Sequence, residues 1–127
     1  MQYMLIYKID ENGPAGGEPR PEMMSAMEKL IGDMAKTGVL VATGGLAPSS
    51  GGTRLRLTGG KFTSTDGPFT ESKELIGGYA IVEVRSKAEA VEWARIFLKV
   101  CADVIGPSYV GESEIRLMHG STAFVEA

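Results

Sequence analysis

Cysteine and histidine are nearly absent from this chain of 127 residues, which has one of each, Cys101 and His119. A single cysteine excludes a disulfide within the chain and a zinc site built from cysteines. A single histidine excludes a metal centre with several histidine ligands, so we expect no metal site. His119 follows no periodic apolar pattern, and we interpret it as an exposed residue near the end of the chain.

Long apolar runs and strong net charge are also lacking. No run approaches the roughly 20 residues needed to span a bilayer, and the first residues do not follow a signal-peptide pattern. The net charge is −3, with no clustered Lys/Arg surface of the kind that binds phosphates. We therefore expect a cytoplasmic, single-domain globular protein that binds neither membranes nor nucleic acid directly.

The common catalytic and nucleotide-binding motifs are missing. Five Gly-Gly pairs occur, but none lies in a phosphate-binding pattern between a strand and a helix. The Gly-x-Ser-x-Gly elbow and the zinc-protease helix motif are absent as well. We interpret the glycine pairs as turns and strand ends, and we expect no cofactor.

What the chain does contain is an ordered series of strand and helix patterns. Pro21 suits the first turn of a helix with an apolar stripe, and Gly38 suits the position just after its end. Ser86 and Glu89 form a capping box that opens a second helix, in which we interpret Cys101 as a small buried hydrophobe rather than a reactive thiol. Gly59-Gly60 between two β-like runs predicts a hairpin. The predicted strands cover 1–9, 39–46, 53–58, 61–65, 79–84 and 114–118.

This order, β-α-β, a hairpin insertion and a second β-α-β, predicts an α+β fold of the ferredoxin-like type with a mainly antiparallel sheet. Both helices then cover one face of the sheet. We expect Tyr3, Leu5, Tyr7 and Ile81 on the other face, where they are too apolar to contact water. A homodimer packed sheet to sheet would cover them.

Two groups of residues are candidates for chemistry. Arg54 and Arg56 share one face of the hairpin, where they could receive an anion or form only a solvated strand face. Downstream, Glu71 and Lys73 could form a tuned acid/base pair with Asp66 nearby. The alternative for this loop is a structural turn that Phe69 anchors in an apolar slot.

The segment Asp66–Glu74, DGPFTESKE, resembles the DGPFAETKE signature of the YCII-related proteins, with Thr70 and Ser72 at the two differing positions. Similarity extends over about residues 1–118, so we take 1–119 as the YCII-related domain and 120–127 as a weakly structured tail. The resemblance implies a dimeric α/β barrel. It is also carried by Tyr3–Tyr7, Gly38–Leu40, Gly45–Pro48, Gly77–Tyr79 and Ala90–Ala94.

The resemblance implies less about activity. Better-known relatives have a His-Asp pair in the cleft, and one relative in chloroaromatic breakdown eliminates chloride from a quinone-like substrate. This chain has no histidine in its first helix, and Asp103 matches the acidic partner only loosely. Proteins with this signature are often encoded beside extracytoplasmic-function sigma factors, which implies a regulatory or sensing role.

Three hypotheses follow, and whether the protein is an enzyme stays open among them. The first is a small-molecule-binding or accessory and regulatory module that uses the cleft between sheet and helices. The alternative is a cofactor-free enzyme for proton transfer or elimination, with Asp66 or Glu71 as base, Lys73 as its electrostatic partner and Arg54 or Arg56 holding an anion. The third is a structural dimer braced by the signature loop. We favour the first, in which Arg54, Arg56 and Phe69 contact the ligand.

Overall fold

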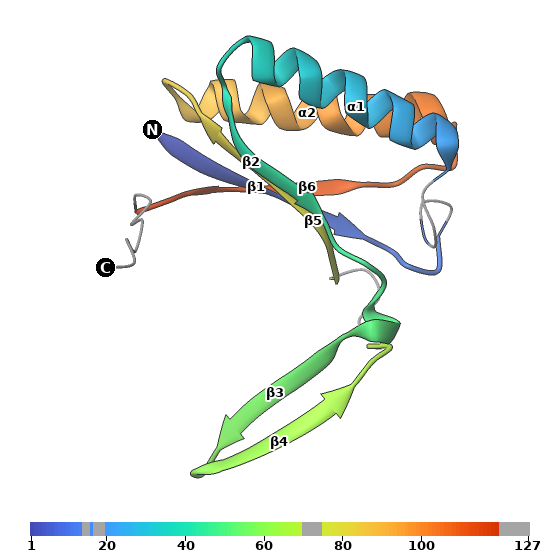
Figure 1. Cartoon of the computed structure of the whole chain (residues 1–127), viewed down its shortest axis with the longest axis vertical. Coiled ribbons are helices and arrows are strands. Elements are labelled where there is room, and N and C mark those ends of the chain that lie inside the picture. Colours follow the sequence, from blue (N-terminus) through green and yellow to red (C-terminus); the bar gives the residue numbers. More distant parts are fainter. Residues whose placement is uncertain (14–15, 17–19, 70–74, 120–127) are drawn as a thin grey trace.

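The computed structural model describes residues 1–13, 16, 20–69 and 75–119. Two helices cover one side of a sheet, and a two-stranded hairpin extends away on the opposite side (Figure 1). The elements in chain order are β1 (Gln2–Ile9), α1 (Pro21–Lys36), β2 (Leu40–Gly45), the short 3₁₀ helix η1 (Ser49–Gly51), β3 (Thr53–Thr58), β4 (Lys61–Asp66), β5 (Leu75–Glu83), α2 (Lys87–Ile105) and β6 (Glu112–Leu117).

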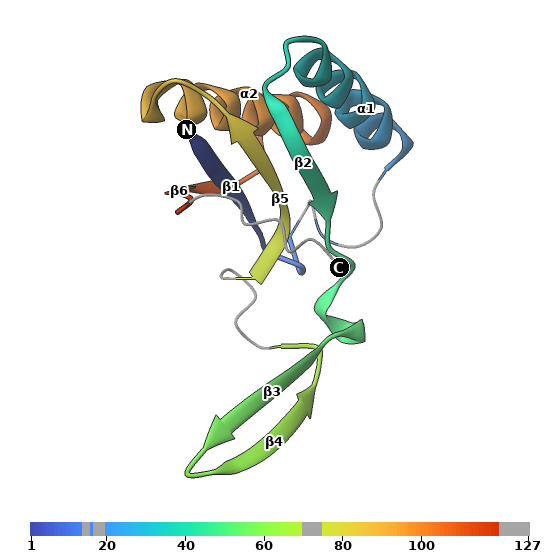
Figure 2. The same cartoon turned by 60° about the vertical axis from the view of Figure 1, so that its left-hand side comes forward.

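The main sheet has the order β2-β5-β1-β6, and each neighbouring pair is antiparallel. Each helix connects two strands that run in the same direction but are not neighbours, as β1-α1-β2 and β5-α2-β6. This is the predicted ferredoxin-like α+β fold, which the structure confirms. A second view shows both helices on the same face of the sheet (Figure 2).

The core lies between this sheet and the helices, and it corrects one prediction. Tyr3, Leu5 and Tyr7 are buried in this core, and the Tyr7 ring stacks on Phe97 of α2 with the ring centres 3.7 Å apart. We expected these three residues on the helix-free face, which was wrong. Because β1 is apolar on both faces, alternation separates its residues into two sets without indicating which set the helices cover.

The helix-free face carries the other set. Met4 of β1 pairs with Ile81 of β5, and Ile6 pairs with Tyr79. Because these residues alternate with the buried ones, their side chains project away from the helices. All four are half-buried in the single chain. The expectation of an apolar helix-free face is therefore correct for Ile81, with Met4, Ile6 and Tyr79 as its neighbours.

The helix ends agree with the sequence patterns. Gly38, just after α1, has φ +76°, a conformation that glycine adopts without the clash of a β-carbon. At the start of α2 the Ser86 Oγ accepts a hydrogen bond from the Glu89 N–H at 3.2 Å. In a capping box the glutamate accepts a hydrogen bond from the N–H of the capping residue, which here is Ser86. The Glu89 carboxylate instead accepts from the N–H of the preceding residue, Arg85, at 3.3 Å. In the described residues, no helix is long and apolar enough to cross a membrane.

Cys101 on α2 is buried, in agreement with its interpretation as a small hydrophobe. Burial raises the pKa of the Cys101 thiol, because a thiolate is poorly solvated among apolar side chains. The hydrogen bond with the Tyr109 side chain acts in the opposite direction on this pKa but is the smaller influence. The thiol is thus held in its unreactive form.

The strands β3 and β4 form a separate hairpin, which we term the arm (residues 53–66). Gly59 and Gly60 at its tip have φ +59° and +78°, as the predicted two-residue turn requires. The arm pairs with no other strand of the described residues, and its strand residues are all exposed. It extends from the end of β2 on the helix-free side of the sheet (Figures 1 and 2).

The core makes a direct prediction for stability. Leu5 is fully inaccessible to water, so Leu5→Ala removes buried contacts and leaves a cavity. We expect it to lower the free energy of unfolding by about 2–5 kcal/mol, measured by urea denaturation. Met24 on α1 is 56% exposed, and Met24→Ala serves as the control, with an expected change within about 0.5 kcal/mol. Equal losses in the two variants would contradict this description of the core.

Candidate functional site

Ser49 is a buried polar residue at the point where β2 leads into the arm. Its N–H donates to Glu11 Oε2 at 2.6 Å, and its Oγ donates to Glu11 Oε1 at 2.7 Å. The same Oγ accepts a hydrogen bond from the Phe69 N–H at 3.1 Å. Ser49 therefore connects the loop after β1, the end of β2 and the segment that follows the arm. We term the contacts around Ser49 the joint.

The backbone is also closely packed at the root of the arm, where β3 begins and β4 ends. The N–H of Gly67 donates to the Gly52 carbonyl at 2.9 Å, and the Gly52 N–H donates to the Ser49 carbonyl at 2.8 Å. A β-carbon at Gly67 would lie 1.8 Å from the Ser49 carbonyl oxygen. Only glycine fits at such a close approach, so Gly67 of the signature has a structural role at this joint.

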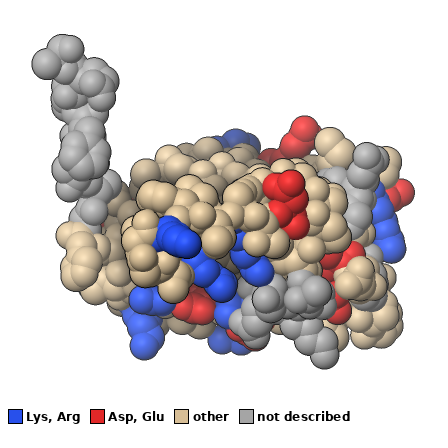
Figure 3. All heavy atoms as spheres, turned by 90° about the horizontal axis from the view of Figure 1, so that it is seen from below, with Lys and Arg blue, Asp and Glu red and all other residues tan. Residues whose placement is uncertain are grey.

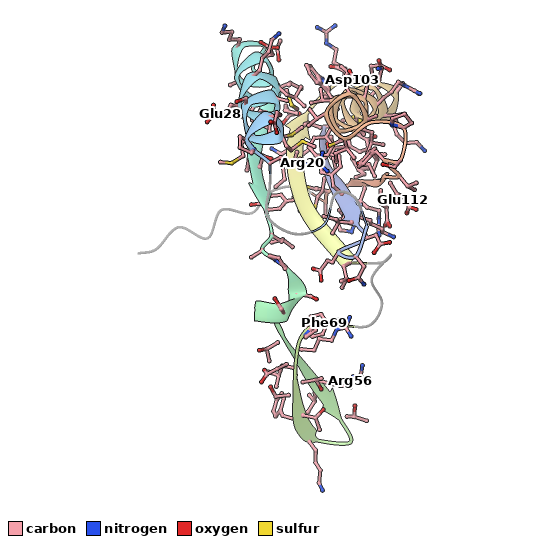
Figure 4. All side chains as sticks on the ribbon, turned by 90° about the vertical axis from the view of Figure 1, so that its right-hand side faces the viewer. Arg20, Glu28, Arg56, Phe69, Asp103 and Glu112 are labelled. Carbon is pink, nitrogen blue, oxygen red and sulfur yellow. The ribbon has the colours of Figure 1, made fainter. Side chains whose placement is uncertain are left out.

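Arg54 and Phe69 lie against each other beside this joint. The guanidinium carbon of Arg54 is 4.0 Å from the centre of the Phe69 ring, within the range of a cation–π interaction. Phe69 lies at the root of the arm, whereas Arg56 lies further along it (Figure 4). The stacking places the cationic group of Arg54 at the root, and anchoring of the loop by Phe69 in an apolar slot stays a prediction.

An open pocket of about 480 Å³ lies at this root. Its volume falls within the range of roughly 300–1,000 Å³ that is usual for small-molecule sites. Arg54 and Glu11 bring charge of both signs to its lining, and Ser49 and Phe69 also contribute. The remaining side chains of the lining are apolar: Leu46, Ala47, Pro48, Leu75 and Ile76. The pocket therefore combines an apolar surface with a positioned guanidinium.

Two of the predicted site residues, Arg54 and Phe69, line this pocket, whereas Arg56 and Asp66 do not. Asp66 is exposed at the end of β4, where its carboxylate accepts a hydrogen bond from Thr53 Oγ1 at 2.9 Å. Because Asp66 pairs with Thr53, it lies on the opposite face of the arm from Arg54. Glu71 and Lys73 lie outside the described residues.

Sequence reasoning missed Glu11 and Ser49. Glu11 lies in a loop rich in small and acidic residues, and Ser49 lies in a Pro-Ser-Ser-Gly turn. The two are 38 positions apart, and no spacing rule connects a loop glutamate to a turn serine at that distance. Only the pairing of β1 and β2 with β5 brings them together.

A second pocket of about 450 Å³ lies at the opposite end of the molecule, between the end of α1 and the start of α2. It is lined by residues such as Gly38, Val39, Arg85 and Trp93, and by Glu83. The terminal amine of Met1 bonds to the Glu83 carboxylate and holds its pKa below the usual value. Core side chains pack between the sheet and the helices, where we expected the ligand cleft, and this pocket lies at the edge of that layer.

Charged residues run along the β6 edge of the helix-free face, where Glu112 pairs with Lys8, Glu114 with Ile6 and Arg116 with Met4. Lys8 Nζ lies 3.4 Å from carboxylate oxygens of both Glu112 and Glu114. Arg116 donates to Glu114 at 2.9 Å, and this hydrogen bond is the main reason why the pKa of Glu114 lies below its usual value, with Lys8 as a further cause. Asp103, the loose match to the relatives' acidic residue, instead bonds to Lys99 on the exposed side of α2.

No group of three or more metal-ligating side chains gathers among the residues that the structure describes. The sheet order, the two covering helices and the arm define a ferredoxin-like α+β protein with an inserted hairpin. The YCII-related domain model matches residues 1–103, and the chain belongs to this family. A search of curated proteins found no match. The last strand, β6, lies beyond the match but pairs with β1 in the centre of the sheet.

The joint predicts the effect of removing one hydroxyl. Ser49→Ala deprives the Phe69 N–H of its acceptor and Glu11 of one donor. We therefore expect it to lower the free energy of unfolding by about 1–3 kcal/mol. Urea denaturation and the exchange rate of the Phe69 amide hydrogen measure it. Ser50→Ala, at the exposed neighbour, is the control, with an expected change within about 0.5 kcal/mol. Unchanged exchange at Phe69 in Ser49→Ala would contradict the joint.

The charged residues of the β6 edge predict a pH effect. The folded-state pKa of Glu114 is lower than its usual value of 4.5, so its ion pairs stabilise the fold above that pH. This contribution is lost as the pH falls through the folded-state pKa. Because Arg116 is the main cause, Arg116→Gln should raise the pKa of Glu114, as followed by carboxyl carbon NMR. The control Arg95→Gln, on the surface of α2, should leave it unchanged, and a Glu114 pKa that is the same in all three proteins would contradict the assignment.

Proposed function

We propose that this protein is a small-molecule-binding module whose ligand occupies the pocket at the root of the arm, and that it acts as a homodimer. The observation that supports the site is the position of Arg54, stacked on Phe69 at the edge of an apolar pocket. A ligand site needs an apolar surface that fills with the ligand and a few oriented polar groups. This pocket has both.

The lining indicates the class of ligand. Arg54 offers donors in a planar fork that suits a carboxylate or a similar anion, whereas Leu46, Pro48 and Ile76 suit an apolar body. Each Glu11 carboxylate oxygen already accepts a bond from Ser49, so this acid serves to hold the pocket wall. The ligand class is therefore a small organic acid with a flat apolar part.

The homodimer is supported by the helix-free face of the sheet. Met4, Ile6, Tyr79 and Ile81 lie next to one another there, with no helix to cover them. Adjacent apolar residues of this kind favour contact with a matching surface, and a two-fold axis supplies the same surface from a second copy. Packing of the two sheets would shield both faces from water.

The other hypotheses lack a comparable observation. For the enzyme, Asp66 lies on the face of the arm opposite Arg54, and so the described residues do not bring a candidate base and the cation together. For regulation, a sigma factor as partner stays an implication of the family resemblance. Both remain predictions, as does a cytoplasmic location.

The test uses benzoate as the probe, because it has a carboxylate on a flat apolar ring. Titration followed by amide NMR should shift the signals of Ser49 and Phe69. Arg54→Gln should weaken binding by about tenfold, the effect of about 1.4 kcal/mol, by removing a charge-assisted contact. Arg56→Gln is the matched control, since Arg56 lies on the same face of the arm but outside the pocket.

Benzyl alcohol provides a second control because it keeps the ring and lacks the charge. Benzyl alcohol should bind to the wild-type protein more weakly than benzoate does. The two compounds should bind to Arg54→Gln with equal affinity. Shifts confined to residues around Trp93 and Glu83 would place binding in the other pocket and overturn the proposed site. Equal weakening in Arg54→Gln and Arg56→Gln would overturn the specific role of Arg54.

A further inference from the structure

The arm has two faces of different chemistry. Leu57 pairs with Phe62 across the hairpin, and Leu55 lies on the same face two residues earlier in β3. The opposite face carries Arg54, Arg56 and Lys61. The arm is thus amphipathic, yet no other element of the described chain covers its apolar face.

The exposure of this apolar face is extreme for a folded protein. Leu55, Leu57 and Phe62 are 70%, 59% and 68% exposed. An isolated two-stranded hairpin is only marginally stable in water, because it has no core of its own. The turn and the joint at Ser49 orient the arm but do not cover these three side chains. Because none of the described residues covers these side chains, a partner surface would stabilise the arm.

The arm also differs in charge from the rest of the chain. Three basic residues and one acidic residue give the arm a net charge of +2, so the other residues of the chain together carry −5 of the total of −3. Seen from below, Lys and Arg side chains lie mainly on one half of the surface, and most Asp and Glu side chains lie on the other (Figure 3). Arg54, Arg56 and Lys61 lie on the face opposite Leu55, Leu57 and Phe62, so the position of the arm, and not its charge, identifies the surface that covers the apolar face.

The arm also extends on the helix-free side of the sheet, the side on which the proposed partner would pack (Figures 1 and 2). A sheet seated on that face would lie beside the arm. In a two-fold assembly each arm would contact the other copy in the same way, so that both apolar faces are covered together.

From these observations we infer that the arm clasps a second copy of this chain, with Leu55, Leu57 and Phe62 buried against it. This inference rests on the proposed homodimer and adds a second contact to it. It also connects the dimer to the ligand site, because Arg54 at the root of the arm lines the pocket. Contact between the arm and the partner would hold Arg54, and with it the pocket wall, in place.

The test compares two double variants made on neighbouring rungs of the hairpin. Leu57→Ser with Phe62→Ser removes the apolar face, whereas Arg56→Ser with Thr63→Ser changes the rung beside it on the opposite face. Dimer dissociation constants are measured by analytical ultracentrifugation. We expect the first variant to weaken the dimer by at least about tenfold, the effect typical of central interface residues. The control should stay within about threefold of wild type.

A third variant separates this inference from the proposed dimer. Ile6→Lys places a charge on the helix-free face and should also weaken dimerisation. A wild-type chain that stays monomeric at every concentration would overturn the homodimer and the inference with it. A dimer that Ile6→Lys weakens but the loss of Leu57 and Phe62 leaves unchanged would overturn the arm's role alone.

Hydrogen exchange gives a readout that does not depend on a substitution. In the wild-type chain, the amides of β3 and β4 should exchange more slowly at concentrations where the dimer forms than after dilution. Amides of β5 that are bonded within the central sheet serve as the internal reference. Arm amides that exchange equally fast at both concentrations, while the dimer is present, would overturn the inference.

Discussion

The packing of the two central strands beneath the helices is the contact on which the rest of this molecule depends. Leu5 of β1 and Val82 of β5 are both fully inaccessible to water. Apolar burial is the main favourable contribution to folding, and here it fixes β1 and β5 side by side. With those strands fixed, the end of β1, the end of β2 and the start of β5 meet at one edge of the sheet.

That edge is where the joint around Ser49 forms. Glu11 follows β1, and Ser49 follows β2, so strand pairing brings a carboxylate and a hydroxyl within hydrogen-bonding distance. The same hydroxyl then holds the backbone of Phe69, which supports Arg54. The position of the Arg54 guanidinium in the pocket therefore depends on the packing of the core, because Ser49 connects the paired strands to the backbone of Phe69. The arm depends on this joint because it has no core of its own.

Local patterns predicted most of the elements to within one or two residues. The strand expected over 1–9 runs from Gln2 to Ile9, and the glycines expected at the end of α1 and at the tip of the hairpin have positive φ. These features depend on neighbours in the sequence, which is why they could be read from it. The facing of Tyr3, Leu5 and Tyr7 was wrong, because alternation alone does not indicate which side a distant helix will cover.

The candidate site divides in the same way. The DGPF signature was enough to recognise the family, and strand alternation and turn chemistry singled out Arg54 and Phe69, since each depends on residue type and short spacing. That these two residues stack, that Asp66 lies on the other face of the arm, and that Glu11 and Ser49 complete the pocket wall depends on strands paired across long separations. A one-dimensional pattern carries propensities over a few residues, whereas the distance between remote groups is set by how the whole sheet packs against its helices.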